Sequence, residues 1–187
     1  MNDTPSAPRN FLRALFTGAP PDDAAGALRM AAARAAARGY VVLPLGLQPA
    51  TDTRELAGLH AAIALQSVRH GRPLAPTVIL SAGPVLRAGA PAGAADFLLA
   101  LALSLDEHAA IHATACGPAV TPDSAGAALA GFLAGPDTVP RALAHRLQPG
   151  GRLLAGEAPA FFAALGDSYA LEPAPGEVLR AIFIALD

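Results

Sequence analysis

A short apolar run at residues 77–80 constrains the fold of this chain more than any other feature. The run is rich in β-branched residues, follows a proline-containing approach and ends in Ser-Ala-Gly-Pro at 81–84. A glycine-rich stretch over 87–93 comes next, and a helix is predicted to begin at 94–97. In α/β sheets, ligands bind at the carboxyl end of a strand beside a helix N-terminus. We therefore expect the candidate site at 81–93.

The rest of the chain repeats this alternation of helices and short apolar strands. Helices are predicted over 11–16, 22–38, 52–70, 94–105, 138–147 and 158–165, and strands over 40–45, 77–80, 109–114 and 178–186. The pattern favours an α/β fold, Rossmann-like, with one mainly parallel sheet and helices on both faces. Residues 1–8 are predicted to be a flexible tail, and 9–187 a single domain.

Several polar residues are predicted to mark helix ends. Asn10 is expected to cap the first helix and Gly18 to end it, and Gly39 is expected beyond the second. Asp52, with Glu55 three residues later, has the pattern of a capping box. Residues 116–126 follow a predicted strand and are expected to form a turn-dense loop.

Composition excludes some classes of function. The net charge of −2 and the lack of a basic stripe argue against nucleic-acid binding. The longest apolar stretch, 97–105, is too short to span a bilayer, so we expect a cytoplasmic protein without membrane contact. All 13 basic residues are arginine, so no lysine can form a Schiff base or clamp a phosphate.

The candidate ligand-binding residues lie around the predicted strand end and in the loop after the third strand: Ser81, Gly83, Arg87, Gly89, Gly93 and Asp123. The backbone N–H groups of the glycine-rich stretch and the Arg87 guanidinium could face an anion. Asp96, expected in the first turn of the next helix, would repel a phosphate there. The alternatives are a tight strand-to-helix connection for 89–93 and helix capping for Asp123.

His108, His112 and Cys116 follow one another at intervals of four. This spacing would suit metal ligands on a helix, but 111–114 reads as a strand, so no metal site is predicted. Cys116 could be a nucleophile after a strand, or a small buried apolar residue.

Several segments, taken in order, carry a resemblance to a known family. They are 77–83, the glycine-rich stretch into Asp96 and Phe97, 123–127, 161–167 and the last predicted strand, with 9–16 and 27–46 before them. Together they resemble class II glycerate kinases (glycerate 2-kinases), in particular their MOFRL-type C-terminal part. The resemblance implies that a large domain of the family, expected around 19–22, is missing here.

The chain departs from the family where ligands would be held. A family run Gly-Arg-Gly-Gly-Arg-Asn-Gln-Glu-Phe corresponds to 89–97, where both arginines and the asparagine are replaced. In the family run Thr-Asp-Gly-x-Asp-Gly-Pro-Thr-Asp, matched to 115–123, only the last acid remains, as Asp123. The late Thr-Asn-Val-Asn-Asp run is Gly-Glu-Val-Leu-Arg at 176–180. Phosphoryl transfer depends on such cations and Mg²⁺ ligands, each clamp being worth roughly 10³-fold in rate.

We therefore predict a degenerate, non-catalytic glycerate-kinase-like domain that acts as an interaction or regulatory subunit. Its expected partner is another protein or a second copy of the chain, and no cofactor is expected. The alternative is a small-molecule-binding protein, with a small organic acid as ligand, or a residual ATP-dependent glycerate kinase. Only a residual kinase would need ATP and Mg²⁺.

Overall fold

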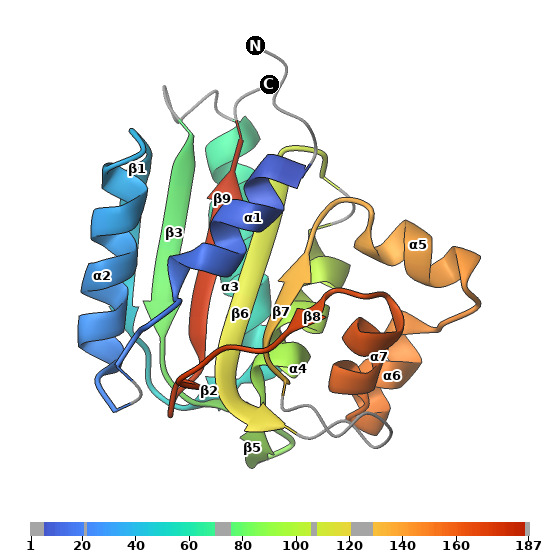
Figure 1. Ribbon diagram of the computed structural model, residues 1–187. Helices are drawn as coiled ribbons and strands as arrows, with labels where there is room; N and C mark the ends of the chain where they lie inside the picture. Colours follow the sequence, from blue (N-terminus) through green and yellow to red (C-terminus); the bar gives the residue numbers. More distant parts are fainter. Residues whose placement is uncertain (1–5, 21, 70–75, 106–107, 121–128, 186–187) are drawn as a thin grey trace.

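The structure is a computed structural model that describes residues 6–20, 22–69, 76–105, 108–120 and 129–185 (Figure 1). Its helices are α1 (Ser6–Leu15), α2 (Ala24–Ala36), α3 (Thr53–Arg69), α4 (Ala94–Ser104), α5 (Thr138–Ala144), α6 (Pro149–Ala155) and α7 (Ala158–Ala164). The strands are β1 (Val41–Leu47), β2 (Thr51–Asp52), β3 (Thr77–Ala82), β4 (Val85–Arg87), β5 (Ala90–Ala92), β6 (Ile111–Val120), β7 (Leu129–Ala134), β8 (Ser168–Tyr169) and β9 (Leu179–Ile184).

Six strands form one sheet in the order β1-β3-β9-β6-β7-β8, and β2, β4 and β5 form a small second sheet. The α/β class and the helices on both faces are confirmed. The main sheet is mixed, however, and not mainly parallel: β1 and β3 pair in parallel, whereas β9 lies antiparallel between β3 and β6. Every residue of β9 is buried, and a strand buried on both faces reads as an apolar run whichever way it points.

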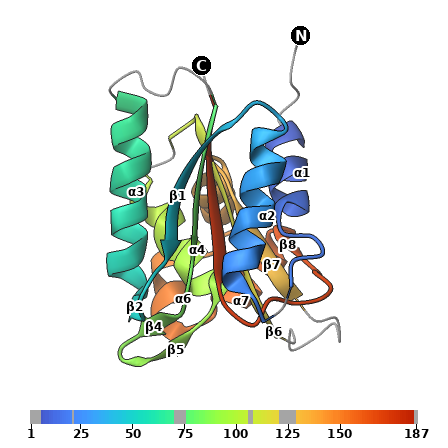
Figure 2. The same ribbon diagram turned by 90° about the vertical axis from the view of Figure 1, so that its left-hand side faces the viewer.

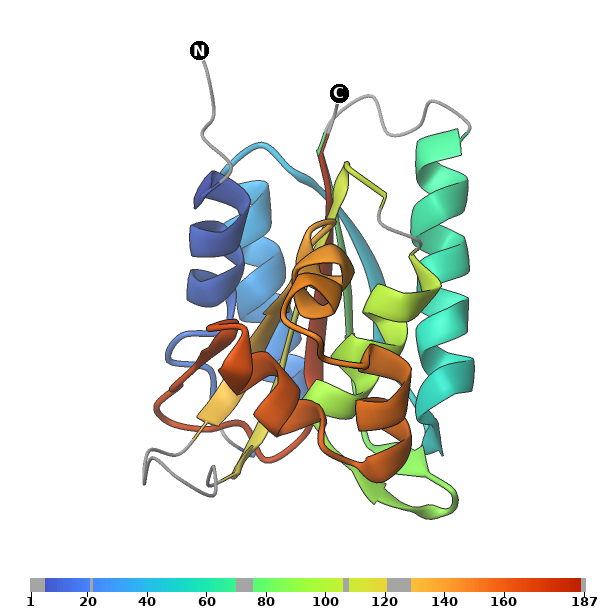
Figure 3. The ribbon, with the colours of Figure 1, turned by 90° about the vertical axis from the view of Figure 1, so that its right-hand side faces the viewer.

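The helices cover the two faces of the main sheet, as the view along its edge in Figure 2 shows. The face of α1 and α2 is closed by one apolar cluster that includes Phe16, Val78 and Leu179. Helices α3 to α7 cover the other face (Figure 3), where the cluster includes Phe97, Ile79 and Ile182. The chain therefore has a core on each side of the sheet.

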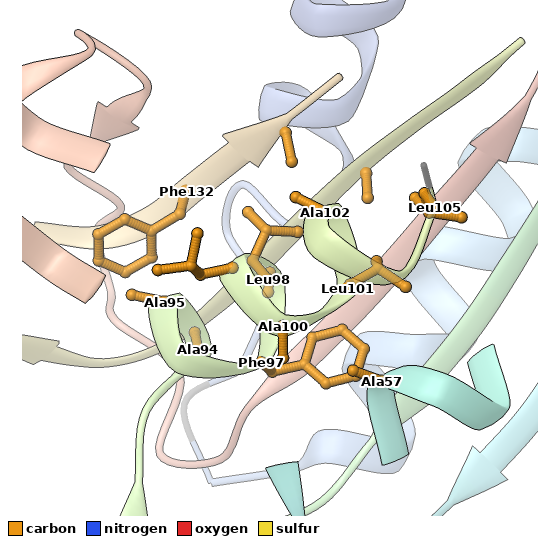
Figure 4. Packing of buried hydrophobic residues seen from close by; sticks show 14 of the residues in the cluster. Ala57, Ala94, Ala95, Phe97, Leu98, Ala100, Leu101, Ala102, Leu105 and Phe132 are labelled. Atoms are coloured by element: carbon orange, nitrogen blue, oxygen red, sulfur yellow. The ribbon is translucent and has the colours of Figure 1, made fainter. Parts of the chain in front are cut away.

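Helix α4 is the centre of the second core, because its residues from Ala94 to Ala102 are all buried. It packs on β6 and β7 and also on α3, α6 and α7. Figure 4 shows that its side chains project on every side, with Phe97 toward Ala57 of α3 and Ala95 toward Phe132 of β7. A helix that is apolar all round has to be enclosed in this way, and α4 fixes the position of the glycine-rich stretch that precedes it.

The helix boundaries largely follow the predicted signals. Asp23 caps α2 by accepting the N–H of Gly26 at 2.7 Å, and Gly39 beyond that helix has a φ of 79°. Asp52 accepts the N–H of Arg54 at the start of α3. The prediction for Asn10 is wrong, because α1 begins at Ser6 and Asn10 lies within it. Residues 6–8 therefore belong to a helix and not to a flexible tail.

Other differences from the sequence prediction concern short elements. The glycine-rich stretch forms a β4–β5 hairpin, and not only a loop. Strand β6 continues through Cys116 to Val120, although a loop was expected from 116 onward. Strand β7 and helix α6 were not predicted. Alanine and glycine dominate β7, and α6 contains two glycines, so neither segment carries a strong periodic pattern.

Candidate functional site

The carboxyl end of β3 holds a buried polar cluster that we call the Arg180 cluster: Arg180, Ser81, His60 and Gly83. Ser81 faces Arg180 across the β3–β9 ladder. The Nε–H of Arg180 donates to Ser81 Oγ at 2.9 Å, and its Nη1 donates to the carbonyl of Gly83 at 3.0 Å. His60 Nε2 lies 2.8 Å from Ser81 Oγ. Two of the predicted site residues, Ser81 and Gly83, are therefore brought together.

The direction of these hydrogen bonds follows from the backbone. His60 Nδ1 lies 2.8 Å from the carbonyl of Leu56, which can only accept, so the imidazole proton is on Nδ1. Nε2 must then accept the Ser81 hydroxyl proton. Burial lowers the pKa of His60 to about 4; the Leu56 hydrogen bond opposes this shift and the charge of Arg180 adds to it. His60 is therefore neutral near pH 7.

Arg180 is the largest fully buried side chain of the described residues, with 1% of it exposed. Burial lowers the pKa of Arg180 to about 10, while the Glu177 carboxylate acts in the opposite direction. The guanidinium lies over the Phe97 ring, 5.2 Å from its centroid. Its Nη2 has no hydrogen-bond partner among the described residues. The cluster thus holds a cation by neutral groups, an arrangement that costs several kcal/mol relative to water.

The pair of Ser81 and His60 has the spacing of a nucleophile and its base. Ser81 and His60 are both 1% exposed, however, and a substrate would have to reach the hydroxyl through the core. A base with a pKa of about 4 is also poorly matched to proton abstraction at neutral pH. The geometry therefore suits a buried hydrogen-bond relay that holds Arg180 in place.

A second group joins Arg87 and Gly93 through Asp96. Arg87 Nη1 lies 2.7 Å from Asp96 Oδ1, and the N–H of Gly93 donates to Asp96 Oδ2 at 3.0 Å. Asp96 thus caps α4 from within and holds the guanidinium of Arg87. Arg87 lines a cavity of about 390 Å³ together with Thr53, Arg54 and other residues.

The remaining predicted site residues lie apart from these groups. Gly89 is exposed in the turn of the β4–β5 hairpin, where its φ of 80° and the φ of 50° at Ala88 make the tight reversal. Asp123 lies outside the described residues. The structure therefore brings together Ser81 with Gly83 and Arg87 with Gly93, but does not bring Gly89 to either pair.

The residues considered for metal or thiol chemistry are separated. Among the described residues, no group of three or more His, Cys, Asp or Glu side chains could hold a metal ion. Burial raises the pKa of the Cys116 thiol, so the reactive thiolate is disfavoured. Burial also lowers the pKa of His112, as does the nearby charge of Arg9, whereas Asp137 opposes the shift.

Sequence reasoning missed His60 and Arg180 as site residues. An arginine inside an otherwise apolar strand, 179–184, was a usable signal, since a buried cation needs specific partners. His60 had a weaker signal: a histidine one turn after Leu56 lies on the apolar face of its helix. Their meeting at Ser81 depends on the antiparallel register of β9, which the sequence pattern does not encode.

The comparisons with known proteins establish the fold. The sequence matches no protein-family model, and no curated protein matches it. Among solved structures, a glycerate kinase from Thermotoga maritima is similar with a TM-score of 0.71 at 17% identity, over 86% of this chain and 40% of that one. The PH0495 protein from Pyrococcus horikoshii is similar with a TM-score of 0.63 at 15% identity, over 87% of this chain and 38% of that one.

The chain therefore has a glycerate-kinase-like fold and spans about 40% of the length of these neighbours. This supports the expected resemblance at the level of the fold. The MOFRL-type assignment is finer than the fold and stays a prediction. No helix in the described ranges combines the length and apolarity that crossing a bilayer needs.

Proposed function

We propose that this chain is a non-catalytic glycerate-kinase-like domain that acts by binding. The observation that carries the proposal is that the polar groups nearest the expected site are occupied by one another. Ser81 is shared by His60 and Arg180. Asp96 is shared by Arg87 and the N–H of Gly93.

Phosphoryl transfer requires the opposite arrangement. Cations and Mg²⁺ ligands must face an open site and be free to contact the phosphates as charge moves. In the described part of the chain Arg180 is enclosed, and the charge of Arg87 is already balanced through its Nη1 by the buried Asp96 carboxylate, although its other N–H groups stay available. We infer that the chain retains the scaffold of a kinase domain without its phosphate-handling groups, as in a MOFRL-type domain whose ligand loops have changed.

The partner we propose is a second copy of the chain, which pairs through β1. This strand is an edge of the main sheet and has seven residues, none of them charged. The side chains of Val41 and Leu47 are 49% and 59% exposed. An uncharged apolar edge strand is prone to pair with another strand, and two identical edges related by a twofold axis are complementary to each other.

The test of the non-catalytic role is calorimetric titration of the full chain with Mg-ATP and, separately, with D-glycerate. The proposal expects no saturable heat of binding with Mg-ATP at concentrations that saturate kinases. Saturable binding of Mg-ATP that is followed by release of ADP when D-glycerate is added would contradict it and favour the second candidate, a residual kinase. A small-molecule-binding role without turnover is favoured by one observation: Arg87 lines a cavity.

A further inference from the structure

Two hollows lie side by side on the face of α3 to α7. The first has a volume of about 390 Å³ and lies among the start of α3, the end of β4 and α6. The second, of about 260 Å³, lies between α4 and α6. Both are lined by Arg54, Leu153 and Leu154, so they lie next to each other. We call them together the α3–α6 groove; Figure 3 shows the face of the molecule on which it lies.

One end of the groove carries a positioned arginine. Arg87 is held by Asp96 on one side and packs against Gly156 on the other, where a Cβ atom would collide with the guanidinium. Gly156 also has a φ of 75°, which favours glycine for a second reason. Only Nη1 of Arg87 donates to Asp96, so the other guanidinium N–H groups remain for a ligand.

Arg54 is the second cation of this end and lines both hollows. None of the ion pairs among the described residues involves its guanidinium. The acids nearby are Asp52, which lines the groove, and Asp96. Asp52 accepts the N–H of Arg54 with Oδ1. Asp96 uses both oxygens, one for the N–H of Gly93 and one for Nη1 of Arg87. The free donors at this end therefore suit an incoming carboxylate, which an arginine binds through paired N–H groups.

The other end of the groove is apolar. It is lined by Ala100, Leu103, Leu153 and Leu154, with Ser104 and Gly150 between them. Leu103 is 40% exposed and Leu154 is 69% exposed, so both present apolar surface to water. Covering that surface with an alkyl chain would be favourable, by about 25 cal/mol for each Å² removed from water.

The geometry points to a binding site for an amphipathic organic anion, with its carboxylate at Arg54 and Arg87 and its unbranched alkyl chain along Leu103 and Leu154. The combined volume lies in the range of small-molecule sites, roughly 300–1,000 Å³. The inference rests on the proposed function only in treating the chain as a binding domain. It names the class of ligand, and it does not involve the Arg180 cluster.

Octanoate is the probe for this site, titrated into the full chain by calorimetry. We expect saturable one-to-one binding, and much weaker binding of acetate, which has the charge without the chain, and of octan-1-ol, which has the chain without the charge. Arg54→Gln should weaken octanoate binding at least about tenfold, the loss typical of a charge-assisted hydrogen bond. Leu154→Ser should weaken octanoate binding and leave acetate binding unchanged.

Matched controls lie on the same helix and on a neighbouring one. Arg69→Gln removes an exposed cation at the far end of α3, and Leu143→Ser an exposed leucine of α5 that does not line the groove. Both should leave octanoate binding unchanged. The inference is overturned if octanoate does not bind saturably, if octan-1-ol binds as tightly, or if Arg69→Gln weakens binding as much as Arg54→Gln. None of these results bears on phosphoryl transfer, so a failure here and a failure of the proposed function are distinguishable.

Discussion

Asp167 is a buried acid that pairs with two arginines. It is 1% exposed and lies between Arg141 of α5 and Arg9 of α1, whose Nη2 is 2.9 Å from Asp167 Oδ1. Asp167→Asn would remove the buried acid of these two arginines and leave them only the exposed carboxylate of Asp137. We expect the free energy of unfolding to fall by about 3 kcal/mol, at the lower end for a broken buried pair because both arginines are partly exposed. Urea denaturation measures the change.

The control for Asp167 is Glu157→Gln. Glu157 pairs with Arg152, but both side chains are more than 40% exposed. An exposed ion pair contributes about 0–1 kcal/mol. If Asp167→Asn and Glu157→Gln lower the free energy of unfolding by the same amount, the buried pairing of Asp167 stabilises the fold no more than an exposed ion pair does.

His60 makes stability depend on pH. Its pKa is about 4 in the folded protein and about 6.5 in the unfolded chain, so the unfolded chain binds more protons between these values. Stability should therefore be unaffected above about pH 6.5 and should fall as the pH drops toward 4, by up to about 3 kcal/mol. Denaturation of the wild type and of His60→Gln across this range isolates the contribution, because His112 contributes equally to both. If the free energies of unfolding of the wild type and of His60→Gln fell in parallel as the pH dropped, His60 would not be the source of the pH dependence.

At the scale of elements, Arg34 joins α1 to α2. Its Nη1 donates to the carbonyls of Ala14, Leu15 and Thr17, at 3.1, 3.0 and 2.7 Å, where α1 ends. A cation there satisfies terminal carbonyls and complements the helix dipole. Arg34→Gln should cost about 1–2 kcal/mol of unfolding free energy. Arg29→Gln on the same helix is the control: that side chain is 74% exposed, and a loss as large there would show a general charge effect.

Most long elements could be predicted from the sequence because their signals are local. Gly39 beyond α2 gave that helix its end, and the apolar run after the proline-rich approach gave β3. What could not be predicted depends on distant pairing. The antiparallel return of β9 between β3 and β6 leaves no local mark, because a central strand is apolar in either direction.

The candidate site was predictable only in part for the same reason. Ser81 and Arg87 could be found because they flank a recognisable strand and its glycine-rich exit. Arg180 is 99 residues from Ser81 in sequence, and its contact with Ser81 exists only in the final register. The groove is even less visible in the sequence, since it needs α6, whose two glycines hide its helical period.

At the scale of the whole molecule, we propose that the edge strand β1 decides the state of assembly. We expect the wild-type chain to form a dimer of twice 18.7 kDa by sedimentation equilibrium. The double variant Val41→Lys/Leu47→Lys should be monomeric, because charges on an edge strand block pairing. A wild-type chain that stays monomeric at every concentration would refute pairing through β1, and so would a double variant that still dimerises.

The central claim is that a glycerate-kinase-like scaffold persists here without phosphoryl transfer. The most direct measurement is release of ADP from Mg-ATP by the full chain, with and without D-glycerate, beside a glycerate kinase such as that of Thermotoga maritima as the active reference. We expect ADP release to stay at the level of the protein-free control in both conditions. ADP release that depends on glycerate and on the concentration of this chain would contradict it.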